Sequence, residues 1–111
     1  MDPVIRNVRD NFDGTKAARL INLDDNPPTC TLTYSEIPPN GTSAHHIHEW
    51  EHVVYVLEGT ATLVCGGKDY TVSQGDAILV PPNEHHQWKN ESQAPVIRVT
   101  YNPVASESAD H

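Results

Sequence analysis

The stretch HHIHEWEH, residues 45–52, holds four of the chain's seven histidines and fits two different metal-binding patterns. From His48 to His52 it matches H-E-x-x-H, which binds zinc only when a helix places positions i and i+4 on one face. As His46, His48 and His52 it fits ligands carried on extended backbone, where alternate side chains share a face. The flanking sequence decides between these two interpretations.

The residues that follow His52 favour extended backbone. HVVYVLEGTATLV, residues 52–64, is rich in β-branched side chains and contains a glycine, while Pro38 and Pro39 leave little room for a helix upstream. We therefore reject the helical zinc-protease interpretation. On a strand His46 and His48 point to one side, and a short turn through residues 49–51 lets His52 begin the next strand facing the same space. Three imidazoles are expected to converge there.

The same alternation extends over most of the chain. Short runs of β-branched and aromatic residues are broken by Gly, Pro, Asn and Asp, which is typical of an all-β sandwich or barrel. Gly66 and Gly67 predict a tight hairpin turn, and no helix of useful length is expected. The expected strands are residues 17–23, 29–36, 43–48, 52–58, 60–65, 68–72, 77–80, 85–89 and 95–101.

Length and charge limit the functions to consider. A chain of 111 residues predicts one domain, with a barrel over about residues 17–101, an N-terminal arm over 1–16 and a flexible tail over 105–111. The formal charge of −8 would repel a phosphate backbone, so nucleic acid is not an expected partner. The sequence contains no apolar run of membrane-spanning length and no secretory leader pattern, which predicts a cytoplasmic protein.

Two spaced motifs in residues 40–90 resemble those of the cupin superfamily. The first, G-x5-H-x-H-x3 or x4-E-x6-G, is followed after fifteen residues by the second, G-x5-P-x-G-x2-H-x3-N. Asn replaces a turn glycine once in each motif, a mild change because Asn best tolerates the left-handed conformation. The matching residues are Asn40, His46, His48, His52, Gly59, Gly75, Pro81, Asn83, His86 and Asn90. The resemblance implies a jelly-roll barrel of the double-stranded β-helix type.

The resemblance also implies a metal centre. Its ligands would be His46, His48, His52 and His86, with His52 in place of the family's carboxylate ligand. Four imidazoles bring no negative charge, so one bound divalent ion would keep its full formal charge and act as a strong Lewis acid. Imidazole suits Mn, Fe, Zn, Ni and Cu, so the metal's identity stays open. His45 and His85 have the opposite strand parity and are expected to point outward or to line the rim.

Three further residues are candidates for the pocket. Trp88 shares parity with His86 and could form an aromatic wall or simply pack in the core. Arg98 lies on one face of the last strand, and if that face is interior its guanidinium could clamp a carboxylate or enolate oxygen. Tyr34 could donate a proton only if it faces inward. For both Arg98 and Tyr34 the strand pattern leaves the direction open.

Small cupins with a four-histidine pattern resemble two functional groups. One consists of manganese- or iron-type dioxygenases that cleave carbon–carbon bonds, and the other of zinc- or nickel-type polyketide cyclases that work without redox change. We expect a metal-dependent enzyme that oxidises a small oxygenated, carbonyl or aromatic substrate. A redox-neutral cyclase, isomerase or lyase and a non-catalytic ligand-binding module are the alternatives.

The outer face of residues 52–58 predicts a partner. Val53, Tyr55 and Leu57 alternate with the inward positions and are too apolar to face water. Another sheet layer or a second copy of the chain would cover them, and the cupin resemblance favours a homodimer.

Overall fold

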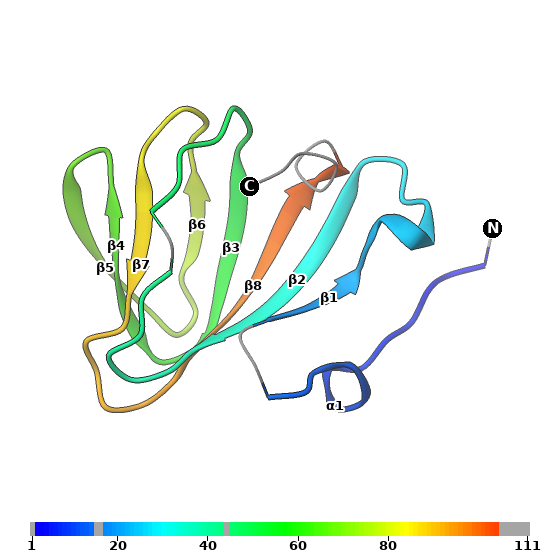
Figure 1. Ribbon diagram of the computed structural model, residues 1–111, viewed down its shortest axis with the longest axis horizontal. Helices are drawn as coiled ribbons and strands as arrows, with labels where there is room; N and C mark the ends of the chain where they lie inside the picture. Colours follow the sequence, from blue (N-terminus) through cyan, green and yellow to red (C-terminus); the bar gives the residue numbers. More distant parts are fainter. Residues whose placement is uncertain (1, 15–16, 44, 105–111) are drawn as a thin grey trace.

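The runs of β-branched residues form strands that pack into two antiparallel sheets (Figure 1). The computed structural model describes residues 2–14, 17–43 and 45–104. Over these residues the strands are β1 (Ala17–Ile21), β2 (Cys30–Ile37), β3 (His52–Glu58), β4 (Thr60–Cys65), β5 (Lys68–Ser73), β6 (Ala77–Val80), β7 (His86–Lys89) and β8 (Val96–Pro103). Two short helices, α1 (Val8–Asn11) and η1 (Leu23–Asp25), flank β1. The all-β prediction is confirmed.

The strand order leaves β1 and β2 remote from the smaller sheet. The larger sheet runs β1-β2-β8-β3-β6 and the smaller one runs β5-β4-β7. Figure 1 shows β1 and β2 on one side of the molecule and the smaller sheet on the other. None of the helices in the described part of the chain has the length and apolar character needed to span a membrane.

The core lies between the two sheets, as strand alternation predicts. On β3, Val54 and Val56 are 1% and 0% exposed, whereas their neighbours Val53 and Tyr55 are 41% and 46% exposed. Val96 of β8 and Trp88 of β7 complete the contact between the layers. Each fully buried valine contributes about 1.5–3 kcal/mol by leaving water. This core holds β3, β7 and β8, the strands on which the site is built, in fixed positions.

The turns use the residues that their backbone angles require. Gly66 and Gly67 both have positive φ between β4 and β5, which confirms the predicted hairpin. Gly59, between β3 and β4, also has positive φ, and a Cβ there would lie 2.7 Å from the Pro95 carbonyl oxygen. Asn40 and Asn83 have φ of 62° and 64°, so the expected tolerance of Asn for the left-handed conformation is confirmed at both positions.

Three expectations about elements need correction. Residues 43–48 were expected to form a strand, but around this segment the described residues form only isolated bridges, Thr42 with Lys89 and His46 with His86. The first strand ends at Ile21 because Asn22 caps the η1 turn with its side chain. The N-terminal arm contains α1, which the sequence did not suggest. Predicted features at residues 1, 15, 16, 44 and 105–111, including the flexible tail, lie outside the described residues.

Candidate metal centre

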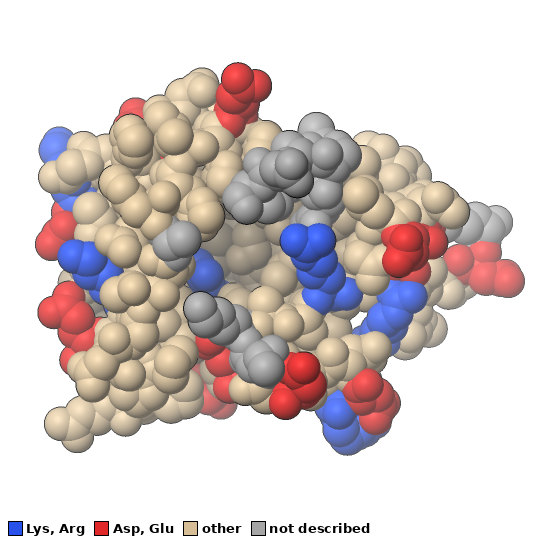
Figure 2. Space-filling view, viewed as in Figure 1, with Lys and Arg blue, Asp and Glu red and all other residues tan. Residues whose placement is uncertain are grey.

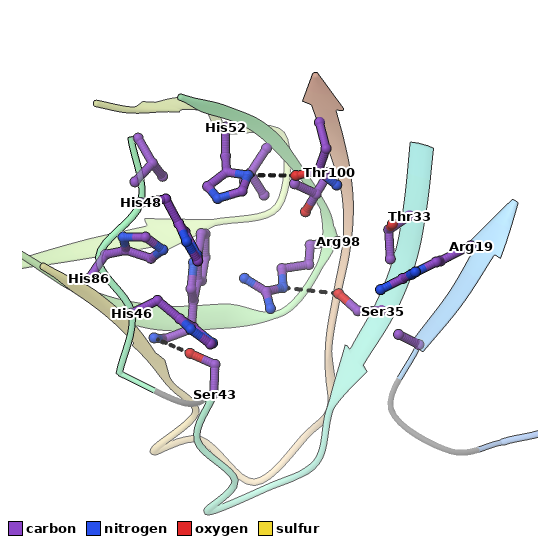
Figure 3. Close-up of a pocket in the computed structure, with 15 residues that line it drawn as sticks. Arg19, Thr33, Ser35, Ser43, His46, His48, His52, His86, Arg98 and Thr100 are labelled. Carbon is purple, nitrogen blue, oxygen red and sulfur yellow. Dashed lines mark hydrogen bonds between the residues drawn. The ribbon is translucent and has the colours of Figure 1, made fainter. Parts of the chain in front are cut away.

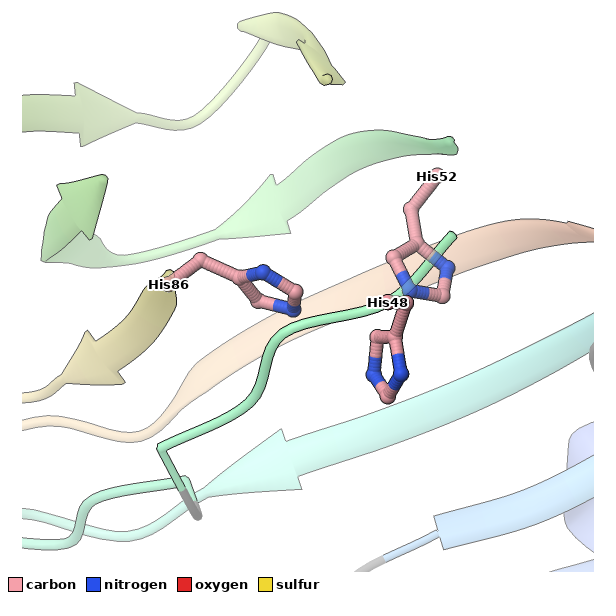
Figure 4. Close-up of side chains that lie close together, drawn as sticks. All are labelled: His48, His52 and His86. Atoms are coloured by element: carbon pink, nitrogen blue, oxygen red, sulfur yellow. The ribbon is translucent and has the colours of Figure 1, made fainter. Parts of the chain in front are cut away.

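Three histidines from separate segments bring ring nitrogens together. His48, His52 and His86 each offer one nitrogen, and these atoms all lie within 4.8 Å of one another (Figure 4). His52 begins β3 and His86 begins β7. Backbone bonds between His46 and His86, of 2.8 and 2.9 Å, align the loop that carries His48 with the start of β7. The expected convergence of His48 and His52 with the distant His86 is therefore present.

Hydrogen bonds at the outer ring nitrogens orient two of these imidazoles. His52 Nδ1 lies 2.5 Å from Asn102 Oδ1, and His86 Nδ1 lies 3.0 Å from the Glu84 carbonyl oxygen. Because both partners are acceptors, each Nδ1 carries the proton and each Nε2 keeps a lone pair for a ligand bond. This is the arrangement that metal-binding histidines usually adopt. His48 is covered by the Trp50 ring, which stacks on it at 4.7 Å between centroids.

The donor set fits one divalent ion of the borderline type. Three neutral imidazoles suit Zn, Ni, Cu, Fe or Mn. Glu49, Glu51 and Glu84 adjoin the histidines in sequence, but their side chains are exposed, and no Asp or Glu is found among the cavity-lining residues that the structure describes. That the ligand set lacks a carboxylate stays a prediction.

His46 lies beside this group without joining it. Its ring stacks on His48 at 5.1 Å and is 6.0 Å from His86, and it lines the same cavity. The structure thus brings ring nitrogens of three of the four predicted ligands within 4.8 Å of one another, and ligation by His46 stays a prediction. The side chains of this segment alternate as they would in a strand, although the segment does not form one. His46 and His48 are half-buried, while His45 and Ile47 are exposed.

The histidines open into a cavity of about 290 Å³ between the sheets (Figure 3). Its lining combines imidazoles, two arginines, small hydroxyl and amide side chains, and apolar walls. The lining residues are Ala17, Arg19, Thr33, Ser35, Ser43, His46, His48, His52, Val54, Val80, His86, Trp88, Arg98, Thr100 and Asn102. Figure 2 shows a hollow on this face, with Lys or Arg atoms inside and beside it.

Arg98 and Trp88 both face this cavity. The Arg98 guanidinium carbon lies 4.6 Å from the centre of the Trp88 ring, and its Nε donates to Ser35 Oγ at 3.0 Å. Removal from water lowers the pKa of Arg98 to about 10, which leaves the group charged at neutral pH. The inward alternative for Arg98 is therefore the correct one, whereas its role in catalysis stays a prediction.

Tyr34 does not face the cavity, which corrects its place among the pocket candidates. Thr33 and Ser35 line the cavity, so the intervening Tyr34 points to the opposite face of β2. There its ring meets Phe12 edge-on at 5.2 Å, and its hydroxyl donates to Glu36 at 2.7 Å. Burial, and next the hydrogen bond to Glu36, raise the pKa of Tyr34 to about 12. The N-terminal arm covers this face, a long-range contact that strand parity could not reveal.

Sequence reasoning missed several polar residues of the site. Asn102, Thr33, Ser43 and Arg19 line the cavity but were not singled out. Asn102 continues the parity of Arg98 and Thr100, so extending the last strand beyond Tyr101 would have found it. His45 and His85 are exposed and stack on each other at 5.1 Å, which confirms that they point away from the cavity.

The fold and site define a small antiparallel β-barrel with a histidine cluster opening into its interior. The family model for the cupin domain matches residues 33–100, more than half of the chain. The chain therefore belongs to the cupin family, and the resemblance seen in its two motifs is confirmed.

Two curated proteins and one solved structure are similar to this chain, and their names describe different activities. It is 30% identical over 96 residues to 5-aminosalicylate 1,2-dioxygenase of Comamonas sp., covering 84% of this chain and 26% of that protein. It is 37% identical over 51 residues to mannose-1-phosphate guanylyltransferase RfbM of Salmonella typhimurium, covering 46% of this chain and 10% of that protein. The polyketide cyclase RemF of Streptomyces resistomycificus superposes with a TM-score of 0.74 at 34% identity, covering 79% of this chain and 63% of RemF.

Proposed function

We propose that this chain is a metal-dependent enzyme that oxidises a small oxygenated or aromatic substrate, with dioxygenase-type chemistry. The observation that carries the proposal is the convergence of His48, His52 and His86 on a cavity whose described lining contains no carboxylate. The 30% identity to 5-aminosalicylate 1,2-dioxygenase over most of this chain supports the choice of chemistry.

The proposed centre uses these three histidines, with His46 as a fourth ligand. When bound, the metal would supply Lewis-acid charge for a substrate oxygen and, in a redox-active form, the means to react with dioxygen. The chain's own residues have separate tasks. Asn102 and the Glu84 carbonyl hold the ring tautomers, the Trp88 ring supports the Arg98 guanidinium, and Arg98 orients the substrate.

The size of the cavity favours a small substrate. A volume of about 290 Å³ lies just below the usual range for ligand sites, about 300–1,000 Å³. A single ring with one or two oxygen substituents suits this space better than a long polycarbonyl chain, part of which would remain outside. Oxidation of a monocyclic compound is therefore the first candidate reaction.

A redox-neutral reaction is the second candidate. The 34% identity to the polyketide cyclase RemF, over 79% of this chain, favours cyclisation, isomerisation or lyase chemistry at the same centre. The two candidates differ in their need for dioxygen and for a redox-active metal.

Oxygen consumption separates the candidates. Protein loaded with Fe, Mn, Zn or Ni would be incubated with hydroxylated benzoates and with β-dicarbonyl compounds in an oxygen electrode. We expect oxygen uptake with Fe or Mn, its loss in His86→Ala, and its retention in the matched control His85→Ala, whose side chain is exposed. Full turnover in anaerobic buffer would contradict the dioxygenase and support the cyclase. Metal-stripped protein that binds the same compounds with unchanged affinity, and never turns them over, would instead indicate a ligand-binding module.

A further inference from the structure

We propose that the cavity selects anionic substrates and that Arg98 is the anchor for a substrate carboxylate. This inference rests on the proposed function, because it takes the histidine-lined cavity as the substrate site. It adds the class of substrate and a residue that determines specificity.

The charge of the cavity is opposite to that of the chain. The chain has 15 acidic and 7 basic residues, for a formal charge of −8. Among the described residues that line the cavity, however, two carry a formal positive charge, Arg19 and Arg98, and none is Asp or Glu. A cleft lined by one sign of charge with low-dielectric walls focuses its field and concentrates ions of the other sign. This cavity therefore attracts anions to a protein that otherwise repels them.

Arg98 is fixed in place without a carboxylate partner. Arg6 pairs with Asp25 and Arg9 with Asp10, in or next to the N-terminal arm, whereas no ion pair joins Arg98 to another described residue. Arg98 is half-buried, and a guanidinium with reduced access to water and no counter-charge is stabilised when a ligand supplies that charge. The Ser35 hydroxyl and the Trp88 ring hold the group, but both are uncharged.

The hydrogen bond that Arg98 donates to Ser35 uses Nε and not the two terminal nitrogens, which can bind a carboxylate as a pair. Arg98 Nε donates to Ser35 Oγ at 3.0 Å, and no hydrogen bond joins its two terminal nitrogens to another described residue, so their hydrogens can bind a ligand. Two such nitrogens form a planar fork that matches the two oxygens of a carboxylate. Stacking over Trp88 restricts the plane of the fork, which reduces the entropy lost when a ligand binds.

Arg98 and His52 lie on the same face of the larger sheet, separated along it by the pair Val54 and Thr100. On β3, Val56 pairs with Arg98 and Val54 with Thr100, and His52 lies two residues beyond Val54. Val56 is fully buried and does not line the cavity, so the cavity closes at this level. Figure 3 shows the Arg98 side chain directed toward the side of the cavity where the histidines lie. A substrate between them would present a carboxylate to Arg98 and a second oxygen to the histidine cluster.

Salicylate and salicylamide test this inference as a matched pair, because they share the ring and hydroxyl but differ in charge. Their binding to the full chain would be measured by titration calorimetry, before and after removal of metal with a chelator. The chelated sample is needed because salicylate also binds free metal ions. We expect salicylate to bind at least about tenfold more tightly than salicylamide in both samples, which corresponds to one charge-assisted pair.

Variants of Arg98 test whether this residue causes the preference for salicylate over salicylamide. We expect Arg98→Gln to remove the preference for salicylate while leaving salicylamide binding unchanged, and Arg98→Lys to retain part of it. Arg9→Gln is the control, since it removes one positive charge at an exposed position of α1. Equal affinity for both compounds in the metal-stripped wild type, or a preference that survives in Arg98→Gln, would overturn the inference. If Arg98→Gln does not fold, as judged by circular dichroism, the wild-type comparison decides alone.

The metal content of the same samples keeps the two proposals apart. Protein that binds no metal yet prefers salicylate would contradict the metal-dependent function and leave the anion site standing. Protein that binds one metal ion per chain without preferring salicylate would contradict the anion site alone.

Discussion

At the scale of single residues, Asn102 determines which nitrogen of His52 faces the cluster. Its Oδ1 accepts from His52 Nδ1 at 2.5 Å, and Asn102 itself is only 9% exposed. Without this acceptor the ring could rotate or change tautomer, and its lone pair would no longer be directed at the centre. The residue thus acts on the metal through His52.

The variant Asn102→Ala is therefore expected to weaken metal binding about 10–100-fold without abolishing it. Competition with a chromophoric chelator would measure the metal dissociation constant. Asn11→Ala, an exposed amide on α1, serves as the matched control and should leave that constant unchanged. Equal affinities for wild type and Asn102→Ala would mean that the His52–Asn102 contact does not orient a ligand.

The bond between Arg6 and Asp25 gives a prediction about acid stability. The hydrogen bond from Arg6, followed by the backbone bond from Asn22, lowers the pKa of Asp25 from 3.8 to about 2. Because the folded-state pKa is the lower one, the stabilisation is complete above about pH 4 and is lost as the pH falls toward 2. The difference in thermal midpoint between wild type and Asp25→Asn should be largest near neutral pH and shrink across this window. A difference that is the same at pH 7 and pH 2.5 would contradict this assignment.

For single residues, the sequence predicts which residues belong to the site better than it predicts the directions of their side chains. The spacing of His46, His48 and His52 was sufficient to predict a shared side, because alternation is a local property. The direction of Arg98 depends on which face of β8 the smaller sheet covers, and that of Tyr34 on which face of β2 the N-terminal arm covers. Those contacts join Phe12 to Tyr34 and Arg98 to Trp88, pairs too distant in sequence for a local pattern to reveal.

At the scale of elements, the segment before β3 shows that alternation can survive without a strand. Isolated bridges at Thr42 and His46 join it to β7 instead of a continuous ladder. These bridges are enough to keep His46 and His48 on one side while the loop continues through Trp50. The predicted strand was wrong here, but the prediction about side-chain direction, on which the site depends, was confirmed.

The turn at Pro38-Pro39-Asn40-Gly41 tests the expectation that Asn tolerates the left-handed backbone conformation better than other residues with a side chain. Asn40 has φ of 62°, and the Gly41 amide donates to the Pro38 carbonyl at 2.8 Å, as in a turn with a left-handed third residue. We expect Asn40→Gly to change the free energy of unfolding by less than about 0.5 kcal/mol and Asn40→Ala to lower it by about 1 kcal/mol. Urea titration would measure both. A loss of stability in Asn40→Gly as large as that in Asn40→Ala would refute the argument.

Hairpins and turns were the most predictable elements of this fold. The limits of β3, β4 and β6 agree with those expected from the sequence, because glycine or proline marks an end of each. The short helices α1 and η1 could not be predicted from apolar periodicity, since each is a single turn capped by an asparagine side chain.

At the scale of the whole molecule, an apolar surface remains on the outer face of the larger sheet. Val53 pairs with Leu79 on one side and with Tyr101 on the other, so these side chains adjoin one another. Tyr55 and Leu57 extend the surface along β3, and all five residues are between 38% and 59% exposed. The sequence predicted this outer face of β3, and a second copy of the chain remains our proposal for what covers it.

The homodimer can be tested by introducing a charge on this surface. Wild-type protein is expected to sediment at twice the chain mass of 12.3 kDa, and Tyr55→Lys at the monomer mass. Tyr70→Lys is a close control, because Tyr70 of β5 is 49% exposed against 46% for Tyr55 but lies on the other sheet. Monomeric wild-type protein at tens of micromolar would exclude the dimer, and equal dissociation in both variants would place the interface elsewhere.

Histidines from two distant segments are proposed to bind one divalent ion inside a β-barrel, and elemental analysis measures whether they do. Wild-type protein, purified and then dialysed against each of Mn, Fe, Zn, Ni and Cu, should retain about one ion per chain of at least one metal. The triple variant of His48, His52 and His86 to Ala should retain none, while His45→Ala and His85→Ala should match wild type. Wild-type protein that retains no metal under any of these conditions, or a triple variant that binds as well as wild type, would contradict the claim.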